Sequence, residues 1–292
     1  MKAVVWSMSS PSQLNTARFS FSDADFAVIA RFASREYGLD LKIEKKGLIY
    51  ARLARRIRAL GMDDFKTYCA YATGGTSRSE QSELLSALTT NVTSFFREQH
   101  HFDMLRSQIL PNLGARLATG KKIRIWSAGC SGGQEPYSIA ATLRESIPNL
   151  PADAVQILAT DVDERILERA KAAVYRPAEV TGLSETAFNK LFTGSKDLRT
   201  SFEVRPELRR MVKFETLNLV GNWVHDVKFD IVFCRNVVIY FERATQHRLW
   251  TRFHDSMTPE GCLFIGHSER LSGPSETRFN NIGITAFEKV SP

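Results

Sequence analysis

The second half of the chain alternates short apolar runs with helical stretches, and this alternation most constrains the fold. The apolar runs are residues 123–129, 155–162, 212–217, 229–234 and 262–266, and the helical stretches are residues 136–145, 164–173 and 243–257. Buried strands that alternate with helices form a parallel sheet, because each crossover helix packs back onto a face of the sheet. We therefore predict an α/β domain with a doubly wound, Rossmann-like sheet over residues 120–292.

Residues 174–211 do not follow this alternation. They contain Phe202 and Val204 at alternating positions and a turn-like Gly194-Ser195 pair. Alternating apolar residues beside a glycine turn are typical of short antiparallel strands. We expect a small antiparallel β-subdomain to be inserted into the α/β domain at about residues 174–211.

The first half of the chain has helical periodicity. Ser22 followed by Asp25 resembles a capped helix start, and Gly61 is a helix stop. Further helices are expected over residues 44–60, 64–71, 78–88 and 99–117, the last with a kink or break at Pro111. The expected organisation is a flexible tail over residues 1–20, an all-helical domain over 21–90, a linker with a connecting helix over 91–119, and then the α/β domain.

The formal net charge of +7 indicates an acidic partner, such as nucleic acid, an anionic membrane surface or a glutamate-rich protein. No apolar run reaches the roughly 18 residues that a transmembrane helix needs, and the N-terminus lacks the pattern of a secretory signal. The four cysteines form no C-x-x-C pair, so neither a zinc site nor a disulfide framework is indicated. We expect a reduced, cytoplasmic protein that binds no metal and does not insert into membranes.

A glycine-rich loop follows the first predicted strand, in the run IRIWSAGCSGGQEPYSIA over residues 123–140. Gly129, Gly132 and Gly133 allow a sharp turn and let a ligand approach the backbone closely. The free N–H groups of the helix that follows add to such a site. The spacing is not a clean G-x-G-x-x-G, so a ligand-binding loop and a plain strand-to-helix turn both remain open.

Polar residues stand at the carboxyl ends of other predicted strands, where doubly wound sheets bind ligands. Asp161 suits ribose hydroxyls through its two acceptor oxygens, whereas Asp163 suits the cap of the helix that follows. Glu135 is either a favourable charge in the first turn of its helix or an acceptor for the ligand. Comparable strand-end positions are occupied by Asn218 and by the pair Arg235-Asn236.

Five segments, in this order, resemble the bacterial chemotaxis receptor methyltransferases, the CheR family. They are RLARRIRALGMDDFKTY (52–68), ALTTNVTSFFRE (87–98), GQEPYSIA (133–140), FCRNVVIYF (233–241) and GHSE (266–269). The resemblance extends from about Phe21 to Phe287. It implies transfer of a methyl group from S-adenosylmethionine to glutamate side chains of chemoreceptors, giving γ-glutamyl methyl esters and S-adenosylhomocysteine. It also implies a class I methyltransferase domain with an N-terminal helical domain and a small β-subdomain.

The resemblance implies roles for particular residues as well. The cofactor-binding set is Asn91, Thr93, Arg97, Gly129, Glu135, Asp161, Asn218, Leu219, Arg235 and Asn236. Arg97 and Tyr240 are expected nearest the transferred methyl group, as the catalytic residues. A glutamate side chain has an unperturbed pKa of about 4.3 and is ionised at neutral pH, so no general base is required. Arg97 suits the steering of that carboxylate, because its planar fork pairs with two oxygens.

A basic stripe of Arg52, Arg55 and Arg58 lies opposite the apolar stripe of the helix predicted over residues 44–60. Taken alone, such a stripe is usually a solvated helix face. With the resemblance, we expect it to dock the acidic cytoplasmic helices that carry the substrate glutamates of chemoreceptors. We expect a monomer that binds no nucleic acid.

In some family members the β-subdomain binds a peptide from the receptor C-terminus by strand addition. The loop expected to support this contact, TGSKDLRTS over residues 193–201, has Gly194 as its one glycine. It lacks the richer glycine content of the peptide-binding members. A peptide-binding edge and a structural flap therefore both remain open.

Other functions have to be weighed against this one. A nicotinamide-dependent oxidoreductase also uses a glycine loop, but Asp161 lies further along the chain than the roughly 20 residues of that fingerprint. A nucleic-acid methyltransferase fits the basic charge, but base-amine methylation usually places an Asn/Asp-Pro-Pro-aromatic run where this chain has CRNVVIY. A non-catalytic module is disfavoured by the presence of Arg97 and Tyr240. The main alternative is a methyltransferase of the same fold acting on another acidic protein or on RNA.

Overall fold

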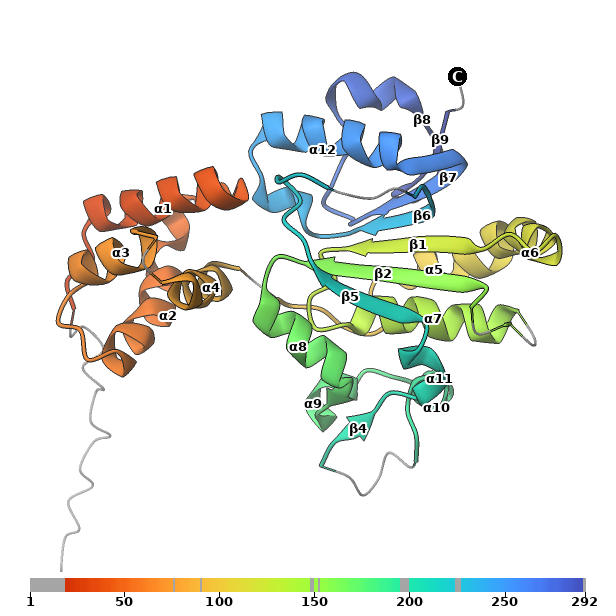
Figure 1. Cartoon of the computed structure of the whole chain (residues 1–292), viewed down its shortest axis with the longest axis horizontal. Helices are drawn as coiled ribbons and strands as arrows, with labels where there is room; N and C mark the ends of the chain where they lie inside the picture. The colour runs from red at the N-terminus through yellow and green to blue at the C-terminus, as the bar shows by residue number, and fades with distance from the viewer. Residues whose placement is uncertain are drawn as a thin grey trace, which may run out of the picture.

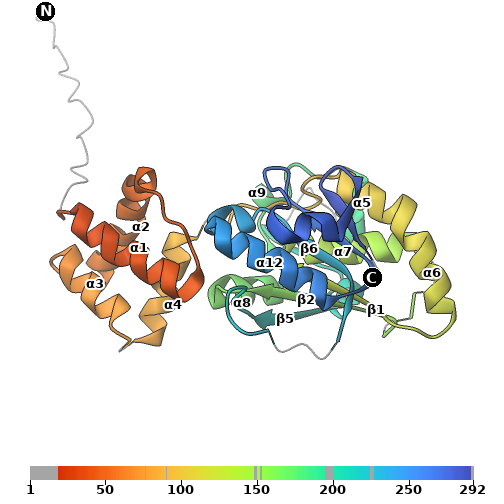
Figure 2. The ribbon, with the colours of Figure 1, turned by 90° about the horizontal axis from the view of Figure 1, so that it is seen from above.

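The computed structural model describes residues 19–75, 77–89, 91–147, 150–151, 153–194, 200–223 and 227–290. A helical body at one end of the molecule is followed by a larger body built on a twisted sheet (Figure 1). Seen from above, the helical body stands beside the sheet body (Figure 2). The tail expected over residues 1–20 lies almost entirely outside the described residues. No described helix is long and apolar enough to cross a membrane.

Four α-helices and one 3₁₀ turn form the helical body. They are α1 (Asp23–Tyr37), η1 (Ile43–Lys45), α2 (Lys46–Ala59), α3 (Phe65–Thr73) and α4 (Arg78–Leu88). The predicted capping box is present, since the Ser22 side chain accepts from the Asp25 backbone N–H at 3.1 Å. Apolar residues of α2 such as Leu53 and Ile57 are fully buried. Arg56 ties α2 to α4 through an ion pair with the buried Glu80 at 2.6 Å.

A connecting helix leads from the helical body to the sheet. It consists of α5 (His100–Met104), a π-helical turn η2 (Leu105–Ile109) and α6 (Leu110–Ala118). The break predicted in this helix at Pro111 is present. Pro111 stands at the start of α6, directly after the π-helical turn, so the regular α-helical hydrogen bonding is interrupted just before the proline.

The sheet body contains seven strands in the order β5-β2-β1-β6-β7-β9-β8. The strands are β1 (Ile123–Ala128), β2 (Val155–Asp161), β5 (Val212–Thr216), β6 (Phe229–Cys234), β7 (Met257–Ile265), β8 (Phe279–Gly283) and β9 (Ala286–Lys289). The first five are parallel, as predicted, whereas β9 runs antiparallel to β7. The chain winds outwards in both directions from β1 and β6, so the topological switch point lies between these two strands.

Helices cover both faces of the sheet, as the alternating pattern predicts (Figure 1). The helices that follow β1, β2 and β6 are α7 (Gln134–Ser146), α8 (Glu164–Ala172) and α12 (Arg243–Ser256), the last preceded by the short η3 (Val238–Tyr240). Trp126 of β1 packs in one core with Phe253 of α12. Its neighbour Ile125 belongs to the other core, with Tyr137 of α7. This division follows the alternation of side chains along a strand.

The insertion at 174–211 contains the expected antiparallel pair, β3 (Val174–Tyr175) with β4 (Phe202–Glu203). The strands are short, and the described residues of the insertion also form three helices, α9 (Pro177–Val180), α10 (Glu185–Leu191) and α11 (Pro206–Arg209). Its core is aromatic, and Phe188 meets Phe202 edge-on at 5.0 Å between ring centroids. The central part of the loop over 193–201, residues 195–199, lies outside the described residues.

Candidate active site

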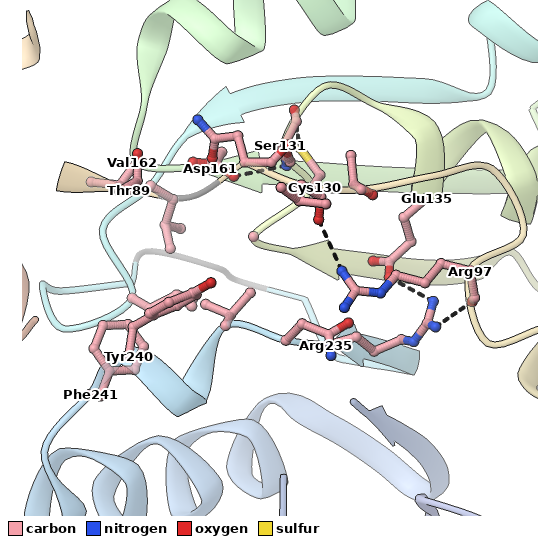
Figure 3. A pocket seen from close by; sticks show the side chains of 18 of the residues that line it. Thr89, Arg97, Cys130, Ser131, Glu135, Asp161, Val162, Arg235, Tyr240 and Phe241 are labelled. Carbon is pink, nitrogen blue, oxygen red and sulfur yellow. Dashed lines mark hydrogen bonds and ion pairs between the residues drawn. The ribbon is translucent and has the colours of Figure 1, made fainter. Parts of the chain in front are cut away.

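A pocket opens at the carboxyl ends of β1, β2, β5 and β6 and faces the helical body (Figure 3). Its empty space is about 970 Å³, a figure that includes open solvent at its mouth. Every residue expected to bind the cofactor or to lie near the methyl group lines it: Asn91, Thr93, Arg97, Gly129, Glu135, Asp161, Asn218, Leu219, Arg235, Asn236 and Tyr240. The structure therefore brings together residues that lie far apart in the sequence, and their individual roles remain predictions.

The glycine loop after β1 forms the floor of this pocket. Gly129 has a φ of +80°, and a Cβ atom there would lie 2.3 Å from Cγ2 of Val237 in the loop after β6. Gly133 has a φ of +88° and caps the N-terminus of α7. Tyr175 of the β-subdomain supports the loop by donating to the Gly132 carbonyl at 2.7 Å. Glycine is thus required at Gly129 both by the backbone conformation and by close approach.

Asp161, at the end of β2, holds the glycine loop from the side. Its carboxylate accepts from the backbone N–H groups of Ser131 at 2.8 Å and Asp163 at 3.1 Å. Burial raises the pKa of Asp161, although these hydrogen bonds favour the ionised form. Asp163 caps α8, as predicted, by accepting from the Arg165 backbone N–H at 3.0 Å. Of the two aspartates, Asp161 lines the pocket and Asp163 does not.

Glu135 and Arg235 form a buried ion pair in the pocket wall. Arg235 Nη1 lies 3.1 Å from Glu135 Oε2, and the Ser127 hydroxyl donates to Glu135 Oε1 at 2.6 Å. Burial raises the pKa of Glu135, and the charge of Arg235 opposes this shift. Figure 3 shows Arg235 between Glu135 and the backbone of Arg97, whose carbonyl accepts from Arg235 Nη2. The Arg235 side chain is 2% exposed.

The helical body contributes directly to the pocket. Tyr37 and Leu39, at the end of α1, line it. Asn218 Nδ2 donates to the Glu36 carbonyl at 2.7 Å, and the Tyr240 carbonyl accepts from the Asp40 backbone N–H at 2.8 Å. The pocket is therefore an interdomain site, closed on one side by the helical body.

The segment between the two bodies crosses the mouth of the pocket. Asn91 Nδ2 donates to Asp163 Oδ2 at 3.3 Å, and Arg97 Nη1 donates to the Val92 carbonyl at 2.9 Å. Thr93 lines the pocket between them. Within the polar run TTNVTSFFRE, Thr89, residues 91–94 and Arg97 thus line the pocket.

The basic stripe on α2 is only partly free. The Arg52 guanidinium donates to the carbonyls of Ala87 at 2.9 Å and Thr89 at 2.7 Å, which fixes the start of the linker. Arg55 and Arg58 are exposed. The structure thus gives Arg52 a structural contact that the sequence did not suggest, and leaves Arg55 and Arg58 accessible to a partner.

Glu98, His100 and His101 place three potential metal-ligand atoms within 4.8 Å of one another. Arg235 Nη2 lies 3.3 Å from Glu98 Oε2, so a positive charge already occupies the neighbourhood of that oxygen. Burial, reinforced by the charge of Arg235, lowers the pKa of His101 to about 3. A second cation beside Arg235 is electrostatically unfavourable, and we assign no metal to this cluster.

Two carboxylates that shape the site were not predicted as site residues. Glu269, in the GHSE segment, accepts from the backbone N–H groups of Asn236 at 2.9 Å and Val238 at 2.7 Å. It thereby fixes the loop after β6, in which Asn236 has a φ of +60°. Glu98, in the FFRE segment, contacts the same loop. Both segments stood out in the sequence, but the direction of these side chains depends on tertiary contacts.

Lys45 was also missed. It lies at the N-terminus of α2, and its ammonium sits 4.9 Å from the centre of the Tyr240 ring, as a cation–π contact. Lys42 and Lys46, on either side of it, pair with Asp40 and Asp23. Lys45 therefore brings positive charge to Tyr240 at the pocket wall.

Family comparisons agree with this arrangement. Residues 24–89 match the all-alpha domain of CheR methyltransferases, and residues 91–287 match the S-adenosylmethionine-binding domain of CheR methyltransferases. A probable chemotaxis protein methyltransferase of Rhizobium etli is 43% identical over 251 residues, which cover 86% of this chain and 94% of the relative. The chemotaxis protein methyltransferase of Salmonella typhimurium is 39% identical, over 88% of this chain and 87% of its own.

The corresponding protein of Escherichia coli is 37% identical, and the match covers 93% of each chain. The two family matches divide the chain between the helical body and the sheet body and together include every pocket residue named above. The sheet order, the glycine loop and the acidic strand end agree with the second match. The chain therefore belongs to the CheR family of S-adenosylmethionine-dependent methyltransferases that act in chemotaxis.

Proposed function

We propose that this chain methylates glutamate side chains in the cytoplasmic helices of chemoreceptors and releases S-adenosylhomocysteine. The observation that carries the proposal is the interdomain pocket, in which buried carboxylates line one wall while Arg97 and Tyr240 line the same space. S-adenosylmethionine supplies a methyl group on a positively charged sulfonium. An acidic wall and a close-approach glycine suit such a donor.

Particular residues fit particular parts of the donor. Asp161 retains acceptor capacity beyond its two backbone hydrogen bonds, which suits the ribose hydroxyls. Glu135 and Arg235 present charges of both signs, which suits an amino-acid group. Asn218 with Leu219, Asn236, and the linker residues Asn91 and Thr93 enclose the remainder. No metal is needed in this arrangement.

The acceptor carboxylate needs positioning more than activation. A glutamate side chain is ionised at neutral pH, so no residue has to remove a proton from it. Arg97 can pair with both carboxylate oxygens and hold one of them in line with the methyl group. Tyr240 borders the same space, and its ring makes the cation–π contact with the Lys45 ammonium. Such alignment lowers the activation barrier by on the order of 7–11 kcal/mol.

The receptor approaches over the N-terminal end and exposed face of α2. Arg55 and Arg58 are exposed there, and Lys45 links this face to the pocket through Tyr240. Methylated receptor helices are acidic, so these charges attract them and set their position. The contact of Arg52 with the linker couples this face to the segment that crosses the pocket.

The chemistry of the product tests this proposal. The purified protein is incubated with methyl-labelled S-adenosylmethionine and membranes that contain chemoreceptors, and the labelled receptor is then treated with base. A methyl ester releases its label as methanol, and that is the expected result. Base-stable label on protein would indicate N-methylation, and label on RNA would indicate the alternative substrate class. Absence of S-adenosylmethionine binding would rule out the proposal altogether.

A further inference from the structure

We propose that Glu98 is a positioning residue for methyl transfer, which holds Arg97 in place by clamping the linker onto the loops that follow β6 and β7. This inference rests on the proposed role of Arg97. Glu98 is not among the residues that line the pocket, and it acts through its contacts with neighbouring residues.

The backbone on both sides of Arg97 is held in an uncommon conformation. Phe96 has a φ of +52° and Glu98 a φ of +56°. Non-glycine residues rarely adopt this left-handed region, and each such residue costs on the order of 1–3 kcal/mol unless its surroundings enforce it. The Phe96 N–H donates to the buried Ser138 hydroxyl at 2.9 Å, which fixes the first side. The second side depends on the Glu98 carboxylate.

The Glu98 carboxylate contacts residues of the two loops that follow β6 and β7. Oε1 accepts from two groups of His267, in the loop after β7: the ring Nδ1 at 2.9 Å and the backbone N–H at 3.3 Å. It also accepts from Asn236 Nδ2 at 3.4 Å, after β6. Oε2 lies 3.3 Å from Arg235 Nη2. Burial opposes ionisation, but these contacts prevail and lower the pKa of Glu98 to about 2, so its charge persists at neutral pH.

Arg235 closes the connection back to Arg97. The same Nη2 atom that pairs with Glu98 donates to the backbone carbonyl of Arg97 (Figure 3). The Arg97 carbonyl is therefore anchored by a guanidinium whose own position depends on Glu98 and Glu135. The Arg235 guanidinium belongs to a side chain that is 2% exposed. Loss of the Glu98 charge would leave it with one carboxylate partner fewer, and the Arg97 backbone would be free to move.

Two roles of Glu98 make different predictions. If it only stabilises the fold, its removal costs the same whether or not Arg97 is present. If it acts by positioning Arg97, its removal matters only while Arg97 is there, because a misplacement of about 1 Å can cost on the order of 10²-fold in rate. A double-mutant cycle separates the two roles.

The test uses Glu98→Gln, Arg97→Ala and the double variant of the full chain, with kcat, receptor KM and the S-adenosylmethionine dissociation constant measured for each. We expect E98Q to lower kcat by about 10- to 100-fold in the wild-type background and to have no further effect in R97A. Glu80→Gln is the matched control, because Glu80 is a buried carboxylate that pairs with Arg56 and does not line the pocket. E80Q is expected to lower the melting temperature and to leave kcat unchanged.

Unchanged kcat in E98Q, or an equal loss in both backgrounds, overturns the positioning role while leaving methyl transfer intact. Normal turnover by R97A overturns both this inference and the catalytic role proposed for Arg97. Should E98Q fail to fold, Glu98→Asp keeps the charge but shortens its reach. The same result is then required of E98D: it must lower kcat in the wild-type background and have no further effect in R97A.

Discussion

At the scale of single residues, Gly129 shows why this loop cannot carry a side chain. A Cβ atom there would lie 2.3 Å from Val237 Cγ2, and the φ of +80° would strain any other residue. Relief of that overlap must move either the glycine loop or the loop after β6, and both line the pocket. The loop is therefore sensitive to the smallest substitution.

We predict that Gly129→Ala weakens S-adenosylmethionine binding by at least about tenfold, because about 1.4 kcal/mol of strain or displacement already has that effect. Isothermal titration calorimetry measures it. Gly120→Ala is the matched control, since Gly120 has a φ of +77° but nothing within 4 Å of its Cβ position. Equal loss of affinity in the two variants would show that backbone strain alone, rather than the close approach to Val237, explains the requirement for glycine.

His101 gives a second prediction at this scale, on pH dependence. It is fully buried and donates from Nε2 to the Ile284 carbonyl at 3.1 Å. Burial, with the nearby charge of Arg235, lowers its pKa from 6.5 to about 3. Between these values the unfolded chain binds a proton that the folded chain does not, so stability falls as the pH decreases below 6.5.

His101→Gln should remove this dependence. Over the first unit of pH below 6.5, the free energy of unfolding of the wild type is expected to fall by on the order of 1 kcal/mol more than that of the variant. Urea unfolding at about pH 7 and about pH 5.5 measures the difference. A variant that loses as much stability as the wild type over this range would mean that other groups carry the pH dependence.

At the scale of elements, helix α2 combines buried packing, a contact with the linker and exposed charge. Its apolar side packs in the helical core, Arg52 binds the start of the linker, and Arg55 and Arg58 face solvent. A charge on an exposed face contributes little to stability but acts on an approaching partner, and salt screens it. The two exposed arginines are thus accessible to a charged partner.

We predict that the double charge reversal Arg55→Glu with Arg58→Glu raises the receptor KM by about tenfold or more at low salt, without changing S-adenosylmethionine affinity. The effect should shrink as the salt concentration rises. Steady-state kinetics at two salt concentrations measure it. Lys122→Glu, at the opposite end of β1 from the pocket, is the control. An unchanged KM at low salt would return this face of α2 to the status of a solvated surface.

Elements also show what the sequence could and could not predict. The central parallel strands were predictable because their apolar runs are largely buried, as in β6, in which every residue is buried. Strand β8 was not, because Asn280 and Asn281 are exposed and give it no apolar run. In the β-subdomain, Phe188 and Phe202 form an aromatic core across helix and strand. Such a core leaves no regular period in the sequence.

At the scale of the whole molecule, the pocket exists because two bodies meet. An isolated β-bridge joins Leu39 to Phe241, and Asn218 donates to the backbone at the end of α1. Residues of the pocket could be predicted from strand ends and from the resemblance to a family. Tyr37 and Leu39, which line the pocket, and Lys45, which contacts the Tyr240 ring, could not, because only the packing of the helical body brings them to these positions. The domain arrangement thus places residues of the helical body in the pocket wall.

The most direct test of this account measures turnover and S-adenosylmethionine affinity in Arg97→Ala and Tyr240→Phe with receptor-containing membranes as substrate. The account predicts that R97A lowers turnover by about 10²-fold, and that Y240F lowers it to a smaller extent, because misalignment rather than lost binding limits the reaction. Both variants should still bind the donor. Near-normal turnover together with normal donor affinity in both variants would contradict the assignment of this interdomain pocket as the place where the methyl group reaches a glutamate.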